Sequence, residues 1–134
     1  MRKLLFLLTI GCTFSCTNRE KMEYDQYLVN GELMYKQKCA NCHGAIGEGL
    51  KDLYPPLANN SHLENTADVI CIIKNGASGK VEVNGKVYDQ AMPANPKVYN
   101  LDIAQLVTFL NHKFLEKDIK VEVKEVVQTL DACK

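Results

Sequence analysis

A short motif, Cys39-Ala-Asn-Cys42-His43, restricts the structures open to this chain more than any other part of its sequence. The pattern C-x-x-C-H is the attachment signature of a c-type haem. Residues three and four positions apart share one face of a helical turn, so both thiols and the imidazole can reach one porphyrin edge and its iron. The motif therefore predicts a covalently bound haem with His43 as an axial ligand.

Two other kinds of site use a pair of cysteines at this spacing. A zinc site needs a second close pair of Cys or His about 12–20 positions later, and His62 and Cys71 do not form one. A thioredoxin-like redox pair is expected beside parallel strands, and no such strand pattern surrounds Cys39 and Cys42. We therefore prefer haem attachment and keep a zinc-binding structural lipoprotein as an alternative.

The N-terminus has the pattern of an export signal. Arg2 and Lys3 precede an apolar run over residues 4–15, and polar residues follow. The run suits the core of a signal peptide and is shorter than the ~20 residues that span a bilayer. We therefore expect residues 1–15 to be a signal peptide and the mature chain to reach the periplasmic side of a bacterial membrane.

Two cysteines near the end of the apolar run resemble a bacterial lipoprotein processing site. Cys12 and Cys16 each follow a small residue. We prefer Cys16 as the lipidation site, because cleavage before Cys12 would leave Cys16 as an odd thiol in an oxidising compartment. Acyl chains on Cys16 would anchor the protein to the membrane, with residues 16–28 as anchor and tether. The alternative is an ordinary secretory signal with incidental cysteines.

The composition indicates one small domain and argues against nucleic acid as a partner. The formal net charge of the 134 residues is zero, and the sequence has no basic tract. Beyond residue 15 there is no second apolar run long enough to cross a membrane, and no internal repeat. A domain of this size has a thin core, so a bound porphyrin would supply much of its apolar centre. We expect a monomer.

Apolar periodicity predicts a mostly helical domain over residues 29–115, followed by a helical extension over 116–134. Asn84-Gly85 between alternating residues predicts a type I′ β-hairpin over 80–88. Glycines and prolines after His43 predict a loop. Helices are expected from near Val29 into Cys39, over 67–74 with Thr66 as cap, from Asp102 with Gln105 completing a capping box, and over about 119–130.

The second axial position of the iron can hold Met or His, or stay open for a small molecule. We prefer Met92, because it lies in a polar, proline-containing loop without the helical stripe of a core methionine. Met34 lies just before the attachment motif, where packing is expected. His62 is the runner-up, and His112 is expected to cap the end of its helix. His/Met ligation raises the reduction potential relative to His/His ligation.

Together these residues make the chain resemble a class I cytochrome c over about residues 29–114. The matching positions are Gly31 and Tyr35 in the N-terminal helix, Phe109 and Leu110 in the C-terminal helix, the attachment motif, and Met92-Pro93. The resemblance implies an all-α cytochrome c fold of three to four helices around one haem c, bound by Cys39, Cys42, His43 and Met92. It also implies that a proline carbonyl accepts the imidazole N–H; we assign Pro56, with Pro55 as the alternative.

Two features depart from the family pattern. The hairpin lies between the middle helix and Met92, where it is expected to position Met92 and shield one haem edge. The tail beyond Leu115 carries Cys133, which we expect to form a disulfide with Cys71; a buried free Cys71 is the alternative.

The resemblance implies a membrane-tethered monohaem electron carrier rather than an enzyme. Its expected partners are redox proteins, namely a respiratory complex, an oxidase or a reductase. The alternative is a haem enzyme or gas sensor in which the sixth position of the iron is labile or open.

Overall fold

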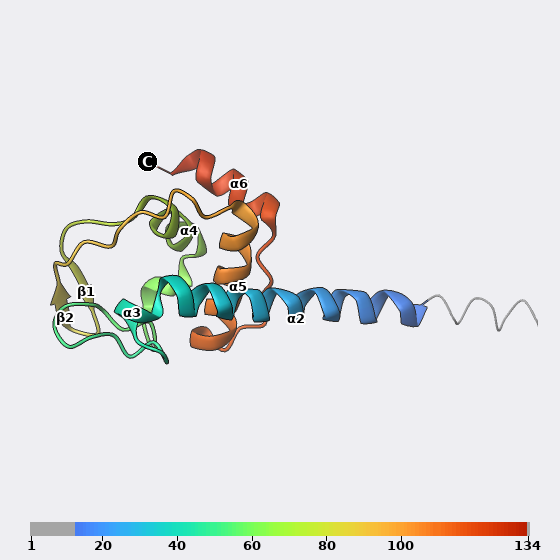
Figure 1. The fold of residues 1–134 in the computed structure, drawn as a ribbon, viewed down its shortest axis with the longest axis horizontal. Coiled ribbons are helices and arrows are strands. Elements are labelled where there is room, and N and C mark those ends of the chain that lie inside the picture. The colour runs from blue at the N-terminus through green and yellow to red at the C-terminus, as the bar shows by residue number, and fades with distance from the viewer. Residues whose placement is uncertain (1–12, 134) are drawn as a thin grey trace, which may run out of the picture.

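The computed structural model describes the backbone of residues 13–133 and the side chains of residues 18–133. In chain order its elements are α2 (Thr13–Lys38), α3 (Ala40–His43), the 3-10 helix η1 (Ser61–Glu64), α4 (Thr66–Asn75), β1 (Val81–Val83), β2 (Lys86–Tyr88), α5 (Asn100–Leu115) and α6 (Val123–Ala132) (Figure 1). The prediction of an all-α fold with one small hairpin is confirmed. None of the helices in this described part combines the length and the apolar character needed to cross a membrane.

Helix α2 begins earlier than the sequence pattern indicated. We expected helical spacing from near Val29, whereas the helix starts at Thr13. Residues 13–30 contain no glycine or proline and include several strong helix formers, so nothing in this segment ends a helix. Tyr27 is 7% exposed and belongs to the hydrophobic core. The segment expected to be a polar tether is therefore helical, and its C-terminal end packs on the domain.

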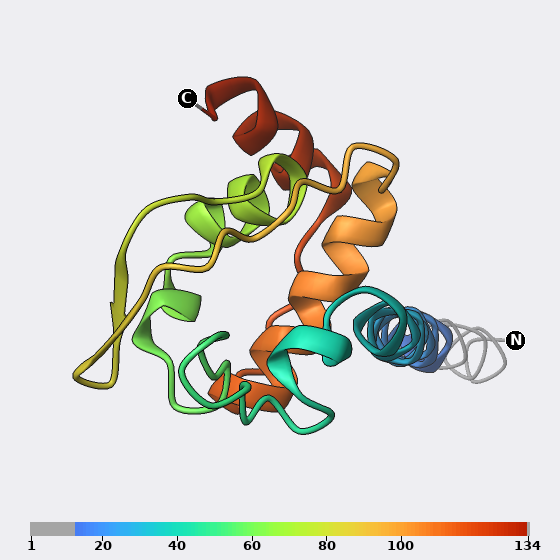
Figure 2. The same cartoon turned by 60° about the vertical axis from the view of Figure 1, so that its left-hand side comes forward.

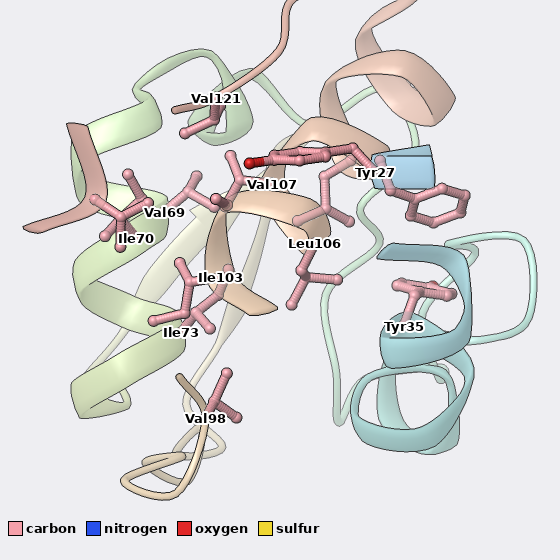
Figure 3. Close-up of a cluster of buried hydrophobic side chains, with 14 of the residues drawn as sticks. Tyr27, Tyr35, Val69, Ile70, Ile73, Val98, Ile103, Leu106, Val107 and Val121 are labelled. Carbon is pink, nitrogen blue, oxygen red and sulfur yellow. The ribbon is translucent and has the colours of Figure 1, made fainter. Parts of the chain in front are cut away.

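The core lies between three helices, with α5 in the middle. Ile103, Leu106 and Val107 of α5 are all buried. Figure 3 shows Ile70 and Ile73 of α4 on one side of this stripe, with α2 on the other side. Three- and four-residue spacing places the apolar residues of each helix on one face, which is why the sequence pattern located α4, α5 and the C-terminal part of α2.

Helices α2 and α5 cross at Gly31, a buried position. A Cβ atom at Gly31 would collide with the backbone oxygen of Gln105 and would lie 2.6 Å from the Cβ atom of Phe109. Because the first obstacle is the backbone of a helix, no side-chain rotation can relieve it. The absence of a side chain at this position therefore allows the two helices to approach closely.

We expect Gly31→Ala to lower the free energy of unfolding of the haem-loaded protein by about 1–3 kcal/mol, the usual cost of overpacking. This loss would occur although alanine favours a helix by ~1 kcal/mol over glycine. Chemical denaturation measures the change. Asn30→Ala, at the exposed neighbouring position, is the matched control and should leave stability nearly unchanged. Equal stability of the two variants would contradict this account of the crossing.

The helix caps differ from those expected. Helix α4 is capped by Asn65 rather than Thr66, since the Asn65 side chain accepts from the backbone N–H of Asp68. Helix α5 starts at Asn100, and the Asp102 carboxylate accepts from the backbone N–H of Tyr99 at 3.0 Å. Asp102 thus occupies the third position of the helix and does not precede it, because its carboxylate reaches back to an N–H that the helix leaves free.

The hairpin has the predicted turn. Val81 pairs with Tyr88 and Val83 with Lys86 in antiparallel register. Asn84 and Gly85 both have positive φ values, 53° and 77°, as a type I′ turn requires. In Figure 2, where α2 is seen nearly end-on at one side, the hairpin lies at the other side of the molecule.

The C-terminal extension packs against three helices of the domain. The backbone N–H of buried Val121 donates to the Thr108 hydroxyl at 2.9 Å, and Val126 of α6 is fully buried. A disulfide joins Cys71 of α4 to Cys133 after α6. Contacts with α2 are made by Lys120, which pairs with Glu23 at 2.6 Å, and by Asp118, which accepts from the Tyr24 hydroxyl at 3.2 Å.

Candidate functional site

The attachment motif forms one turn of helix directly after α2. The N–H of Cys39 donates to the carbonyl of Tyr35 at 2.9 Å, which continues the helical pattern across the junction. The N–H groups of Cys42 and His43 both donate to the Cys39 carbonyl, at 3.1 and 2.9 Å. Gly44 then ends the turn with a φ of 84°. The two cysteines and the histidine therefore have the helical spacing that the motif predicted.

One cleft brings this turn together with the segment around Met92. The two cysteines have free thiols. Most of the other lining side chains are apolar, and they come from both ends of the domain sequence. The lining residues are Met34, Lys38, Cys39, Cys42, His43, Ile73, Met92, Pro93, Asn95, Val98 and Leu106.

This set of residues fits a c-type haem. It offers two thiols for thioether bonds, an imidazole and a thioether sulfur for the iron, and an apolar wall for the porphyrin. Burial, with a further contribution from neighbouring Cys42, raises the pKa of the Cys39 thiol to about 11. Among residues 18–133, whose side chains the structure describes, no three or more His, Cys, Asp or Glu side chains gather as a metal site would need. These described residues therefore supply no further ligands that would complete a zinc site with Cys39 and Cys42.

The imidazole of His43 is held in one orientation by a backbone carbonyl. Its Nδ1 atom lies 2.9 Å from the oxygen of Pro55. A carbonyl only accepts, so Nδ1 carries the proton and Nε2 keeps its lone pair. Burial lowers the pKa of His43, although the bond to Pro55 opposes this shift. The ring is therefore neutral at pH 7, with Nε2 ready to bind a metal.

The carbonyl that meets His43 belongs to Pro55, which corrects our assignment of Pro56. The carbonyl of Pro56 instead accepts from the Asn60 side-chain amide at 2.9 Å. The loop register explains the difference: the N–H groups of Leu57 and Ala58 both donate to the Gly47 carbonyl. These bonds fix the proline pair against the attachment turn, and sequence spacing alone does not reveal which carbonyl faces the ring.

Tyr35 links the helix crossing to the attachment turn. Its hydroxyl donates to the carbonyl of Gly44 at 2.6 Å, directly after His43. Its ring packs against Phe109 and Phe114, with centroid distances of 5.6 and 5.7 Å. Burial raises the pKa of Tyr35 to about 12, so the hydroxyl stays protonated and keeps donating. Tyr35, the aromatic residue that matches the family pattern in the N-terminal helix, thus also supports the loop that follows His43.

The segment carrying Met92 is held against the end of α4. Met92 and Ala77 exchange two backbone hydrogen bonds of 2.8 and 3.0 Å. The side chain of Asn95 donates to the Ile73 carbonyl at 3.1 Å, and Lys74 donates to the carbonyls of Pro96 and Val98. The roles of Asn95 and Lys74 were not anticipated from the sequence, since nothing in their spacing indicates a contact between these two segments.

The remaining residues singled out from the sequence lie away from the cleft or outside the described part. His62 bonds to the Glu82 carbonyl, and His112 pairs with Asp118 rather than with the end of its own helix. Cys12 lies outside the described residues. The backbone of Cys16 belongs to α2, but its side chain lies outside the described part.

A cleft with two free thiols on one helical turn, a neutral imidazole and a methionine defines the binding site of a c-type haem protein. The family model of cytochrome c matches residues 28–113, and the chain therefore belongs to the cytochrome c family. It is a class I monohaem c-type cytochrome with one covalently bound haem c.

Two relatives support this assignment. A cytochrome c-552 from Thermus thermophilus is 30% identical over 89 residues, which cover 63% of this chain and 65% of the relative. A cytochrome c-552 from a particular strain of the same species is 29% identical over 89 residues, covering 63% of this chain and 57% of the relative. The chain thus spans less than two thirds of the length of either relative.

Proposed function

We propose that this protein is a single-electron carrier rather than an enzyme. Cys39 and Cys42 would hold the haem by thioether bonds, and His43 Nε2 and the Met92 sulfur would fill both axial positions. The observation that carries the proposal is that one cleft collects these four side chains while Pro55 occupies Nδ1 of His43. When bound, the haem iron supplies reversible one-electron redox chemistry.

The surrounding residues would set the properties of that site. The Pro55 carbonyl fixes the orientation of the His43 ring and raises its basicity as a ligand. Met92, a soft ligand, favours the reduced state. Ile73, Val98 and Leu106 line the cleft with apolar surface and restrict the access of water. With both axial positions filled by the chain itself, no position is left for a substrate.

We further propose that the protein acts in the cell envelope. The basic and apolar N-terminus supports export through a signal peptide over residues 1–15. Lipidation of Cys16 would anchor the chain on the periplasmic side of a membrane, followed by residues 16–28, the haem domain over 29–115 and the extension over 116–134. An anchored carrier would be concentrated near its redox partners, which we propose to be a respiratory complex, an oxidase or a reductase.

Expression with intact haem-maturation machinery tests the proposal. We expect haem that remains on the protein through acid-acetone extraction, a weak long-wavelength sulfur-to-iron band in the ferric protein, and a ferrous protein that resists carbon monoxide. Colourless protein would contradict haem attachment. Immediate formation of a carbon monoxide complex would instead favour a haem enzyme or gas sensor with an open sixth position. Mass spectrometry of the mature protein would report acyl chains on Cys16.

A further inference from the structure

Asn60 is a buried polar residue next to the loop that supports His43. It is 6% exposed, and both ends of its side chain are used. Its Nδ2 donates to the Pro56 carbonyl at 2.9 Å, and its Oδ1 accepts from the backbone N–H of His62 at 3.0 Å. The residue before Pro56 is Pro55, whose carbonyl accepts from His43. Asn60 therefore fixes the peptide segment that orients the proximal imidazole.

The side chain of His62 continues these contacts to the hairpin. Its Nε2 lies 2.9 Å from the carbonyl oxygen of Glu82 in β1. A carbonyl only accepts, so Nε2 is the donor. A second set of contacts also holds the hairpin. Lys86 of β2 pairs with the Asp52 carboxylate and donates to the Lys51 carbonyl at 3.1 Å. The hairpin is thus fastened to the loop that follows His43 through Lys51 and Asp52, and to η1 through His62.

The hairpin in turn leads directly to Met92. Backbone pairing between Ala77 and Met92 joins the two ends of the segment that contains both strands. Val83 and Tyr88 are 3% and 5% exposed, although neither belongs to the main core cluster. The hairpin therefore packs as a separate unit. Besides the packing of these two side chains, the polar contacts of His62 and Lys86 described above fix its position relative to the loop that follows His43.

We propose that Asn60 and His62, which we call the brace, are positioning residues that hold the segments of His43 and Met92 in a fixed relation to each other. Hydrogen bonds run from His43 through Pro55-Pro56, Asn60 and His62 to the hairpin, and the chain continues from the hairpin to Met92. Loss of the brace would loosen both axial ligands while leaving the helical core intact. The inference rests on the ligands named in the proposed function.

The proximal half of the brace is tested with Asn60→Asp in the haem-loaded protein. An ionised aspartate keeps the acceptor for the His62 N–H, loses the donor to Pro56 and places a carboxylate oxygen against the Pro56 carbonyl, so the measurement is made at a pH at which the carboxyl is ionised. We expect solvent exchange of the His43 Nδ1 proton, followed by NMR of the ferrous protein, to become about five- to tenfold faster, the factor that one lost hydrogen bond gives. The control is Asn65→Asp at an exposed position: Asn65 also caps a helix with its side chain and donates to an acceptor, the Asp68 carboxylate, but contacts neither ligand segment. Equal rates in the two variants would overturn the brace.

The distal half is tested with His62→Ala, at an exposed position where the fold should persist. The readout is the affinity of the ferric protein for added imidazole, which competes with Met92. We expect about five- to tenfold tighter binding in His62→Ala. His62→Gln, whose amide can donate to the Glu82 carbonyl, should restore nearly wild-type affinity. His112→Ala, remote from the cleft, serves as the control for loss of an exposed histidine.

These outcomes separate the brace from the ligand assignment. Wild-type protein without the sulfur-to-iron band would overturn the proposed ligands and the brace with them. Wild-type protein that shows the band, together with an affinity for imidazole that neither His62 variant changes, would overturn the brace alone. Tighter imidazole binding in His62→Ala that His62→Gln reverses would support it.

Discussion

Replacement of Met92 by alanine is expected to open the sixth position of the haem iron. The ferric protein should lose its long-wavelength sulfur-to-iron band, and the ferrous protein should bind carbon monoxide at once. The reason is that alanine supplies no sulfur, while the neighbouring cleft residues offer no free imidazole in its place. Visible absorption spectra of both oxidation states measure the change. Retention of the band in Met92→Ala would contradict Met92 as the ligand.

A second methionine supplies the matched control. Met34 lines the same cleft and also packs against the core, but it lies on α2 before the attachment turn. Met34→Ala should keep the band and exclude carbon monoxide. Met92→His should also exclude carbon monoxide, but with a reduction potential lower by on the order of 0.1 V, within the ~0.8 V range that axial ligands cover. Loss of the band in Met34→Ala alone would transfer the ligand role to Met34.

Removal of the Cys71–Cys133 disulfide is expected to cause the largest loss of stability. The two cysteines are 62 positions apart, so the bond restricts a long loop in the unfolded chain. The loop-entropy relation gives about 4 kcal/mol for the double replacement Cys71→Ala/Cys133→Ala. Chemical denaturation of the haem-loaded protein measures this difference in the free energy of unfolding.

The same variant should keep a normal haem spectrum, because neither cysteine lines the cleft. Reduction of the wild-type disulfide with a thiol reagent offers an independent control and should lower the stability by a similar amount. Unchanged stability in both experiments would show that the non-covalent contacts of the extension, such as the packing of Val121 and Val126, hold it in place without the disulfide.

The parts of the fold that follow local spacing could be predicted from the sequence. Apolar residues at three- and four-residue intervals located α4 and α5, because each helix buries one face. Asn84-Gly85 predicted the hairpin, because both residues tolerate the positive φ that its turn requires. The C-x-x-C-H spacing predicted one helical turn, because hydrogen bonds between residues close in sequence determine the shape of that turn.

The parts that depend on contacts between distant segments could not be predicted. Pro55 and Pro56 are equivalent in sequence, and only the return of the loop to Gly47 decides which carbonyl meets His43. Asn60 lies in a polar stretch that looks like solvated loop, yet it is buried by tertiary packing. The start of α2 was missed because its apolar face is short there, and because part of the cover over Tyr27 comes from Lys120, which lies beyond the predicted domain.

The length of α2 has a mechanical consequence. Its 26 residues form one uninterrupted helix, which at 1.5 Å per residue is a rod of about 39 Å. Glu23 and Tyr24 fasten this rod to Lys120 and Asp118, so it cannot pivot freely against the rest of the molecule. If the N-terminal end of this helix were fixed at a surface, a rigid helix rather than a flexible linker would connect the haem domain to that surface. The length and direction of the helix would then set the distance and the orientation at which the domain meets a docking protein.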